Sequence, residues 1–347
     1  MFQITLSRKF LLITLALALA GCGGNKPEEK SDGAKPTPEG EKGGSFKVGL
    51  VTSGPVSDNG WNAGAYKSLQ TIKTELGADI QNVEAPSAVQ QEENLRAYAS
   101  KKFNVVIGHG AEYESLALKI EKEFPNTQFL ISSGGKAGVN TTPIIYKLED
   151  GAYLLGMLAA GTSKTGKLGA VGAMKIPPLE RIFKAFELGA KAINPSITIL
   201  PAVYTGSWDD AVKAGQQTKA ILDQGADVIL QDVDAAALGV FNAVKERSTA
   251  AKPIYALGTN SDQNAVSPDV VLASAPIYYD KTMVNLVKKV KEGNYKPSDT
   301  PIGMKDGAIG FVMNPQLASK VSADLKAKID AATKEIAEGK LDVLKGK

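Results

Sequence analysis

From residue 46 onward, the sequence alternates between short apolar runs and longer amphipathic segments. The first run, 46–52 (FKVGLVT), is followed by a turn rich in Gly, Pro, Ser and Asp. Segment 61–76 comes next, with apolar residues at helical spacing. Strands separated by such helices predict right-handed βαβ units, in which helices cover both faces of parallel sheets. The fold class is therefore α/β.

The same alternation continues along the chain and places the other elements. We expect further strands at 80–83, 103–107, 128–131, 144–146, 167–171, 197–203, 228–230, 254–257 and 270–273. We expect further helices at 89–101, 112–124, 149–162, 179–193, 209–224, 236–247 and 280–292.

These strands are too many for one doubly wound sheet, so we expect two Rossmann-like lobes. We assign 46–148 plus about 276–305 to the first lobe, and 149–275 plus about 306–347 to the second. Loops at the carboxyl ends of the strands would line a cleft between the lobes, which is the usual ligand position in open α/β folds.

The N-terminal 45 residues differ from this body. Residues 1–21 are typical of a secretory signal peptide: Arg8 and Lys9 precede an apolar run that is too short to span a bilayer. The run ends in Leu-Ala-Gly-Cys, which resembles the bacterial lipobox, and Cys22 is the only cysteine. The alternative is a plain signal peptide with a chance Cys. Residues 22–45 lack large apolar side chains, so we expect a disordered tether with a lipidated Cys22.

Composition excludes several classes of function. One Cys and one His exclude a disulfide framework, a CxxC motif and a multi-histidine metal site, so we expect no metal and no cofactor. The net charge is +3, and +1 (3 − 2) after loss of Arg8 and Lys9, which argues against nucleic acid as a partner. The sequence contains no G-x-S-x-G, P-loop or H-E-x-x-H motif, and we expect no enzyme.

The two tryptophans are the most informative residues. Trp61 follows the first strand in SDNGWN, and Trp208 follows a later strand in GSWDD. Each lies in a strand-to-helix loop, one in each predicted lobe, and neither belongs to an apolar run. We expect the two indoles to face each other across the cleft and to hold a flat ring between them. The alternative is that each packs on its own lobe as a loop anchor.

Polar residues at strand ends would contact the edges of such a ring. Asn offers a donor and an acceptor, and a carboxylate accepts hydrogen bonds from amines or hydroxyls. Any of these residues could instead cap the helix that follows it. His109, after the strand 103–107, is either an ordinary polar contact or a ligand contact. The other candidates are Asp58, Asn62, Asp232, Asp234, Asn260 and Asp262.

The lipobox together with GLVT, SDNGWN, GSWDD and GTNSDQ, in this order, resembles the basic membrane protein family of ABC-transporter substrate-binding lipoproteins. The resemblance implies a type I periplasmic-binding-protein fold, with two lobes joined by hinge strands that close on a ligand. It implies a purine base or nucleoside between Trp61 and Trp208, a base contact at Asn62, and a ribose contact near Asn260 or Asp262. It also implies a monomer that is lipid-anchored on the outer side of the cytoplasmic membrane, with ABC permease and ATPase subunits as partners.

This chain departs from the nucleoside-binding pattern in the resembling family at three places. Ser53 stands where those proteins usually carry Asp, Asn260 replaces a ribose-contacting Asp, and Ile277 replaces a Lys. The turn 54–61 is closer to adenine-type free-base binders. We therefore expect a purine base or nucleoside, with a free base more favoured than in a typical member. The alternatives are another flat heterocycle, a ligand-sensing surface lipoprotein without transport, and an α/β hydrolase or transferase.

Overall fold

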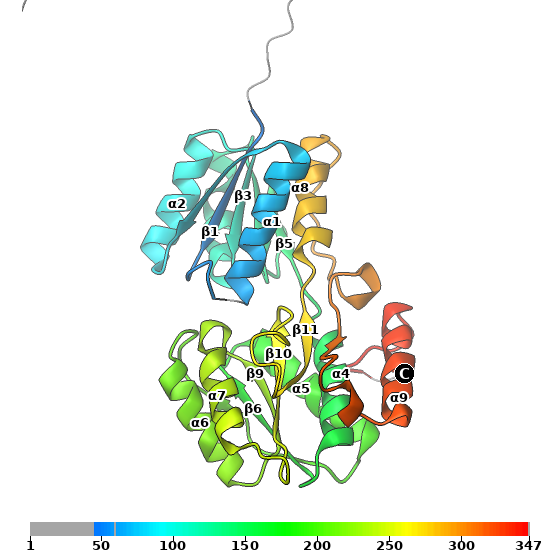
Figure 1. Ribbon diagram of the computed structural model, residues 1–347. Helices are drawn as coiled ribbons and strands as arrows, with labels where there is room; N and C mark the ends of the chain where they lie inside the picture. Colours follow the sequence, from blue (N-terminus) through cyan, green and yellow to red (C-terminus); the bar gives the residue numbers. More distant parts are fainter. Residues whose placement is uncertain (1–44, 59, 346–347) are drawn as a thin grey trace, which may run out of the picture. The chain divides into compact units, whose positions relative to one another are not determined.

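A computed structural model describes residues 45–58 and 60–345. The predicted signal peptide, the tether up to residue 44 and Cys22 lie outside the described residues. The first sheet has the order β2-β1-β3-β4-β5, and every neighbouring pair is parallel (Figure 1). Its strands are β1 (Lys47–Thr52), β2 (Asp79–Glu84), β3 (Val105–His109), β4 (Gln128–Ser132) and β5 (Thr141–Ile144).

The second sheet has the order β12-β11-β10-β9-β6-β7, with β8 paired to β6. All pairs are parallel except the short β12, which runs antiparallel to β11. The strands are β6 (Lys167–Gly172), β7 (Thr198–Ile199), β8 (Val203–Tyr204), β9 (Val228–Asp232), β10 (Tyr255–Asn260), β11 (Val271–Pro276) and β12 (Val312–Met313).

Helices cover both faces of each sheet, and alternate strand residues build the core on each side. On the first sheet, Val48 and Leu50 pack toward α1 (Trp61–Leu76) and α8 (Met283–Lys291), while Val51 faces the cluster that contains α2 (Ala88–Ser100) and α3 (Glu114–Ile120). The second sheet is covered by α4 (Glu149–Thr162), α5 (Pro177–Ile193) and α9 (Ala323–Ala337) on one face, and by α6 (Ala211–Asp223) and α7 (Ala237–Arg247) on the other.

The chain passes between the two sheets three times. It leaves the first sheet after β5, returns after β11 to form α8, and leaves again before β12 (Figure 1). Two isolated bridges join these passages: Tyr146 pairs with Ile302 in parallel, and Ile277 pairs with Ile309 in antiparallel. The mixed α/β fold with parallel sheets is thus as predicted, and the exact lobe limits stay a prediction.

Most predicted elements begin and end within three residues of the observed ones, and the larger differences have local causes. The strand expected at 197–203 is two short strands, β7 and β8, around Pro201, which has no N–H for a ladder hydrogen bond. The helix expected at 112–124 is α3 between two 3₁₀ turns. The helix expected at 280–292 begins only at Met283, because Thr282 (φ −115°, ψ −73°) breaks the turn before it. The sequence analysis missed β12 and α9.

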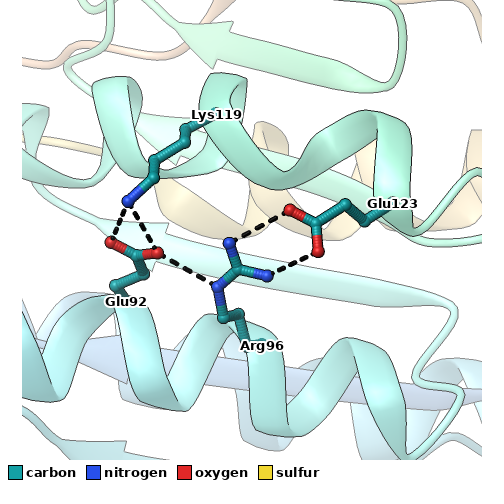
Figure 2. A network of polar contacts seen from close by, with 4 residues as sticks. All are labelled: Glu92, Arg96, Lys119 and Glu123. Carbon is teal, nitrogen blue, oxygen red and sulfur yellow. Dashed lines mark hydrogen bonds and ion pairs between the residues drawn. The ribbon is translucent and has the colours of Figure 1, made fainter.

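A polar network connects α2 to the segment that carries α3 (Figure 2). Arg96 donates from Nε to Glu92 (3.0 Å) and from both Nη atoms to Glu123 (2.7 and 3.1 Å). Lys119 Nζ donates to both oxygens of Glu92 (3.0 and 2.9 Å). Lys119 and then Arg96 lower the pKa of Glu92, and Arg96 lowers the pKa of Glu123. The four side chains therefore act as one charge-balanced group on the outer face of the first sheet.

Replacing Gly189 by Ala should destabilise the second sheet's helix layer. A Cβ at Gly189 would lie 1.9 Å from the backbone oxygen of Tyr153, because α4 and α5 touch backbone to backbone there. The helix-propensity gain of about 1 kcal/mol cannot offset this clash, and overpacking costs about 1–3 kcal/mol or more. Urea unfolding of Gly189→Ala should show a net loss of stability. Gly135→Ala is the control, because nothing lies within 4 Å of its Cβ position. An equal loss of stability in both variants would contradict this account.

Arg96→Gln should lower the melting temperature at neutral pH. Glu92 and Glu123 have depressed folded pKa values, so their stabilisation is present above the ordinary carboxyl pKa and is lost as the pH falls through the folded values. The difference from the wild type should shrink at about pH 3 and in about 1 M salt, where the Debye length is about 3 Å. Lys328→Gln, which breaks an isolated pair with Asp324, is the matched control. A difference that persists unchanged at low pH and high salt would refute the ionic origin.

Candidate functional site

Asp58, in the loop between β1 and α1, organises the first turn of that helix. Its Oδ1 accepts from the N–H groups of Gly60 (3.0 Å) and Ala63 (2.8 Å). Its Oδ2 accepts from the backbone N–H (2.8 Å) and the side-chain Nδ2 (3.0 Å) of Asn62. Four donors thus meet one carboxylate at the positive end of α1. This arrangement fixes the loop that carries Trp61.

Trp61 stacks on His109 at the carboxyl end of β3. The ring centroids are 4.1 Å apart and the planes are inclined by 18°. His109 Nε2 lies 2.9 Å from the carbonyl oxygen of Trp61, so it must donate, and Nδ1 then accepts from Ser132 Oγ (2.8 Å). Burial lowers the pKa of His109 to about 3, against a smaller opposing effect of the hydrogen bond to Trp61. The imidazole is therefore neutral and covers one face of the indole.

Two tyrosines that the sequence analysis did not select complete this aromatic cluster. Tyr146 and Tyr279 meet Trp61 edge to face, with centroid distances of 6.2 and 6.1 Å. Both hydroxyl groups are buried, and burial raises the pKa of each. Each tyrosine follows closely on a strand, β5 and β11 respectively. Their position at the carboxyl ends of strands is the sequence feature that would have identified them as candidates.

The second sheet presents a cluster of polar residues at the ends of β9 and β10. Asn260 Nδ2 donates to Asp232 Oδ1 and to Asp234 Oδ1, at 3.1 Å each. All three side chains are buried. Asp234 (φ +46°) and Asn260 (φ +64°) both adopt left-handed backbone conformations, which Asp and Asn tolerate better than most residues. Such strain is concentrated at functional sites.

Burial dominates the electrostatics of this cluster. Desolvation raises the pKa of Asp232 to about 7, against hydrogen bonds from Asn260 and Thr259 that lower it. Desolvation also raises the pKa of Asp234 well above its ordinary value, and the charges of Asp232 and Asp58 raise it further. A buried carboxyl whose pKa is shifted by burial and by neighbouring charges is a candidate functional group.

Loops from both sheets meet at one cavity of about 90 Å³. A Cβ at Gly60 would lie 3.6 Å from Asp234 Oδ1, so the turn after Asp58 directly adjoins the second sheet's cluster. The structure therefore brings Asp58 and Asp234 together, as expected for residues at the carboxyl ends of parallel strands. The lining residues are Ser57, Asp58, Asp234, Ala235, Ala237, Leu238, Phe241, Gln263 and Val266.

Trp208 lies in the second sheet's half of the site. Its ring is half-buried and packs on the cluster beneath α6 and α7, beside Leu200 and Val203. Its carbonyl oxygen accepts from the N–H of Ala236 (3.0 Å), which ties the Trp208 loop to the turn that begins at Asp234. The ring contacts of the described residues pair Trp61 with His109, Tyr146 and Tyr279, but not with Trp208.

The remaining predicted residues do not line the cavity. Ser53 is half-buried directly after β1. Asn62 is buried beside Asp58, and its Oδ1 has no hydrogen-bond partner. Asp262 is exposed and accepts from the N–H of Asn264 (3.1 Å), so it shapes its own loop. The sequence analysis did not select Gln263, which is buried and accepts from Gln231 Nε2 (2.7 Å).

A larger cavity, of about 610 Å³, lies at the opposite edge of the first sheet. It is lined by residues at the amino ends of β1 and β2, with Lys47, Lys73, Lys101 and Asp79 among them. None of the polar strand-end residues discussed above lines it. The candidate site is therefore the smaller cavity. Among the helices of the described residues, none is long and apolar enough to cross a bilayer.

Two known proteins align with most of this chain. A purine-binding protein of Brucella abortus is 26% identical over 290 residues, which cover 82% of this chain and 81% of that protein. A CD4+ T-cell-stimulating antigen of Listeria innocua is 26% identical over an alignment of 362 residues, which covers 99% of this chain and 98% of that protein.

Solved structures support the fold. An ABC transporter solute-binding protein of Aeropyrum pernix K1 superposes with a TM-score of 0.78 at 21% identity, over 86% of this chain and 92% of that chain. The predicted type I periplasmic-binding-protein fold is thereby confirmed. Residues 45–342 match the family model of PnrA-like ABC transporter substrate-binding proteins. The chain therefore belongs to the Bmp family of PnrA-like ABC transporter substrate-binding proteins, as the resemblance of its motifs predicts.

Proposed function

We propose that this chain captures a purine base or nucleoside between its two sheets and delivers it to an ABC permease. One observation carries the proposal: polar side chains from the carboxyl edges of both sheets line one cavity, and one of them, Asp58, fixes the turn that carries Trp61. Asp58 also holds Asn62, the neighbour of Trp61 in the first turn of α1. The purine-binding relative of Brucella abortus supports the same class of ligand.

Trp61 supplies a rigid stacking surface. His109 covers one face of the indole, and two tyrosines contact the ring in T-shaped arrangements. The proposed ligand stacks on the face opposite His109. Trp208 covers the ligand from the second sheet, since its loop is bonded to the Asp234 turn. A base stacked on an aromatic side chain gains about 1–3 kcal/mol per ring.

The edge contacts come from groups that already lie at the cavity or next to it. Asn62 Oδ1 is a buried acceptor without a partner, and Asp234 and Asn260 stand across from it on the second sheet. Ser53, Asp58 and Asp262 lie in the loops around these groups. This set offers acceptors and amide donors but no basic side chain, which suits a ligand with ring N–H, amine or hydroxyl groups.

Ligand entry requires the two sheets to separate. The cavity of about 90 Å³ is much smaller than the volume of about 300–1,000 Å³ that is typical of small-molecule sites. The three chain passages between the sheets act as the hinge strands. Binding then shifts the population toward a closed form, which is recognised by the permease and its ATPase.

We also propose that Cys22 anchors the protein to the outer side of the cytoplasmic membrane. The lipobox-like Leu19–Cys22 sequence supports this, and so do relatives that are named lipoprotein and basic membrane protein. The body would then collect its ligand next to the permease, as a monomer.

Intrinsic fluorescence of residues 45–347 should change when adenine or adenosine is added, because the chain has two tryptophans and the proposed ligand lies between them. Uridine and a sugar are the comparison ligands. Trp208→Phe leaves Trp61 as the sole reporter and should retain a response. The stacking site would be contradicted if none of the bases and nucleosides changed the emission or competed for binding.

Trp61→Leu should weaken purine binding by about 5- to 150-fold, which corresponds to about 1–3 kcal/mol of stacking. Trp61→Phe keeps an aromatic face and should recover most of the affinity. Isothermal titration calorimetry measures both, with melting temperatures as the folding control. Equal affinity in the Leu and Phe variants would show that the ring face is not used.

Cys22→Ser should release the protein from the membrane fraction of cells that express the full chain, because the thiol is the atom that would be acylated. The distribution between membrane and soluble fractions is measured by immunoblotting. Persistence of the Ser variant in washed membranes would contradict a lipid anchor at this residue.

A further inference from the structure

Asp232 and Asp234 form a carboxylate pair that is held by a single amide. Asn260 Nδ2 lies 3.1 Å from one oxygen of each, so the two Oδ1 atoms are within about 6 Å of each other (3.1 + 3.1 as the upper limit). Asp232 is 1% exposed and Asp234 is 9% exposed. Two like charges this close in a dry environment cannot both be ionised at low cost.

The surroundings supply no compensating cation. No ion pair formed by the described residues includes Asp58, Asp232 or Asp234. The other titratable groups that act on the pair come from every neighbouring element: Asp58 from the β1–α1 loop, Glu112 from the turn after β3, and Tyr279 after β11. All of them are acids. His109 and Tyr146 contact Tyr279 and are neutral at pH 7.

A second observation, two buried polar atoms without a hydrogen-bond partner near this cluster, supports a ligand here. Asn62 is 6% exposed and Tyr279 is 4% exposed, yet Asn62 Oδ1 and the Tyr279 hydroxyl have no hydrogen-bond partner. Asn62 is bonded to Asp58, which shares the cavity with Asp234. Buried polar atoms without a partner cost about 1–3 kcal/mol each, and a ligand with polar edges would satisfy them.

We propose that Asp234 is protonated in the empty site, because the Asp232–Asp234 pair cannot hold two charges at low cost, and that keeping or losing this proton selects which purine edge the site accepts. The inference rests on the proposed function, because it concerns the ligand of the same site. Asp234 is the member that contacts the ligand, since it lines the cavity and Asp232 does not.

The selection follows from hydrogen-bond complementarity. A protonated carboxyl presents one O–H donor and one acceptor, which matches the ring nitrogen and amine of adenine. An ionised carboxylate presents two acceptors, which matches the N1–H and amino group of guanine. Adenine therefore binds with the proton kept on Asp234, and guanine binds as the proton leaves to solvent. Burial raises the pKa of both carboxyls, so Asp234 can keep its proton well above the ordinary pH range of a carboxyl.

The test is the ratio of adenine to guanine affinity as a function of pH. We expect the ratio to fall about tenfold per pH unit where Asp234 titrates, because the two complexes differ by one proton. Calorimetry in buffers of different ionisation enthalpy should also show proton release with guanine only. A ratio that does not depend on pH, with both bases still bound, would overturn this inference but not the proposed function. Absence of binding by either base at every pH would overturn both.

The Asp234→Asn variant removes the titratable proton and keeps the shape of the side chain. Its amide keeps one donor and one acceptor without titrating, and Asn tolerates the left-handed backbone at this position. The variant should bind adenine with an affinity that does not vary with pH, and should lose the pH-dependent gain for guanine. Asp223→Asn, at an exposed ion pair with Arg247, removes the same charge elsewhere and should behave as the wild type. A pH-dependent ratio that persists in Asp234→Asn would overturn the assignment to Asp234.

Discussion

Parallel strand pairing is the constraint on which the rest of this structure depends. It brings the carboxyl ends of β1, β3 and β4 to one edge of the first sheet, and those of β9 and β10 to one edge of the second. Trp61, His109 and Ser132 meet at the first edge for this reason, although they are far apart in sequence. The three passages between the sheets then bring the second edge within contact distance of the first.

The site combines a rigid half with an electrostatically strained half. On the first sheet, Asp58 satisfies four donors, and burial keeps His109 neutral against the opposing effect of its hydrogen bond to Trp61. On the second sheet, one amide bridges two buried carboxyls, and Asp234 and Asn260 have left-handed backbone conformations. A buried charge without a partner is costly, so such a cluster persists where a ligand or a proton compensates it. The division suits a binding protein, in which the preformed half orients the ligand and the other half discriminates.

The sequence predicts the layers of the fold well, because apolar periodicity and turn residues are local properties. It also identifies the strand-end loops as the place of the site. It could not show that Trp61 stacks on His109, since that contact joins residues 48 positions apart through the pairing of β1 with β3. Nor could it show that Asn260 joins Asp232 to Asp234. The break at Pro201 was visible in the sequence, and so was the helical spacing of Leu325, Ile329, Ala332 and Ile336 in α9. Both features can therefore be predicted from the sequence.

A crystal structure with a bound purine tests the central claim most directly. The account predicts that the base lies on the face of Trp61 opposite His109, with its edge within hydrogen-bond distance of Asp234 and of Asn62 Oδ1. It also predicts that the two sheets are held together by those contacts. A purine bound elsewhere, or one bound between the sheets without contact to Trp61 and Asp234, would contradict it.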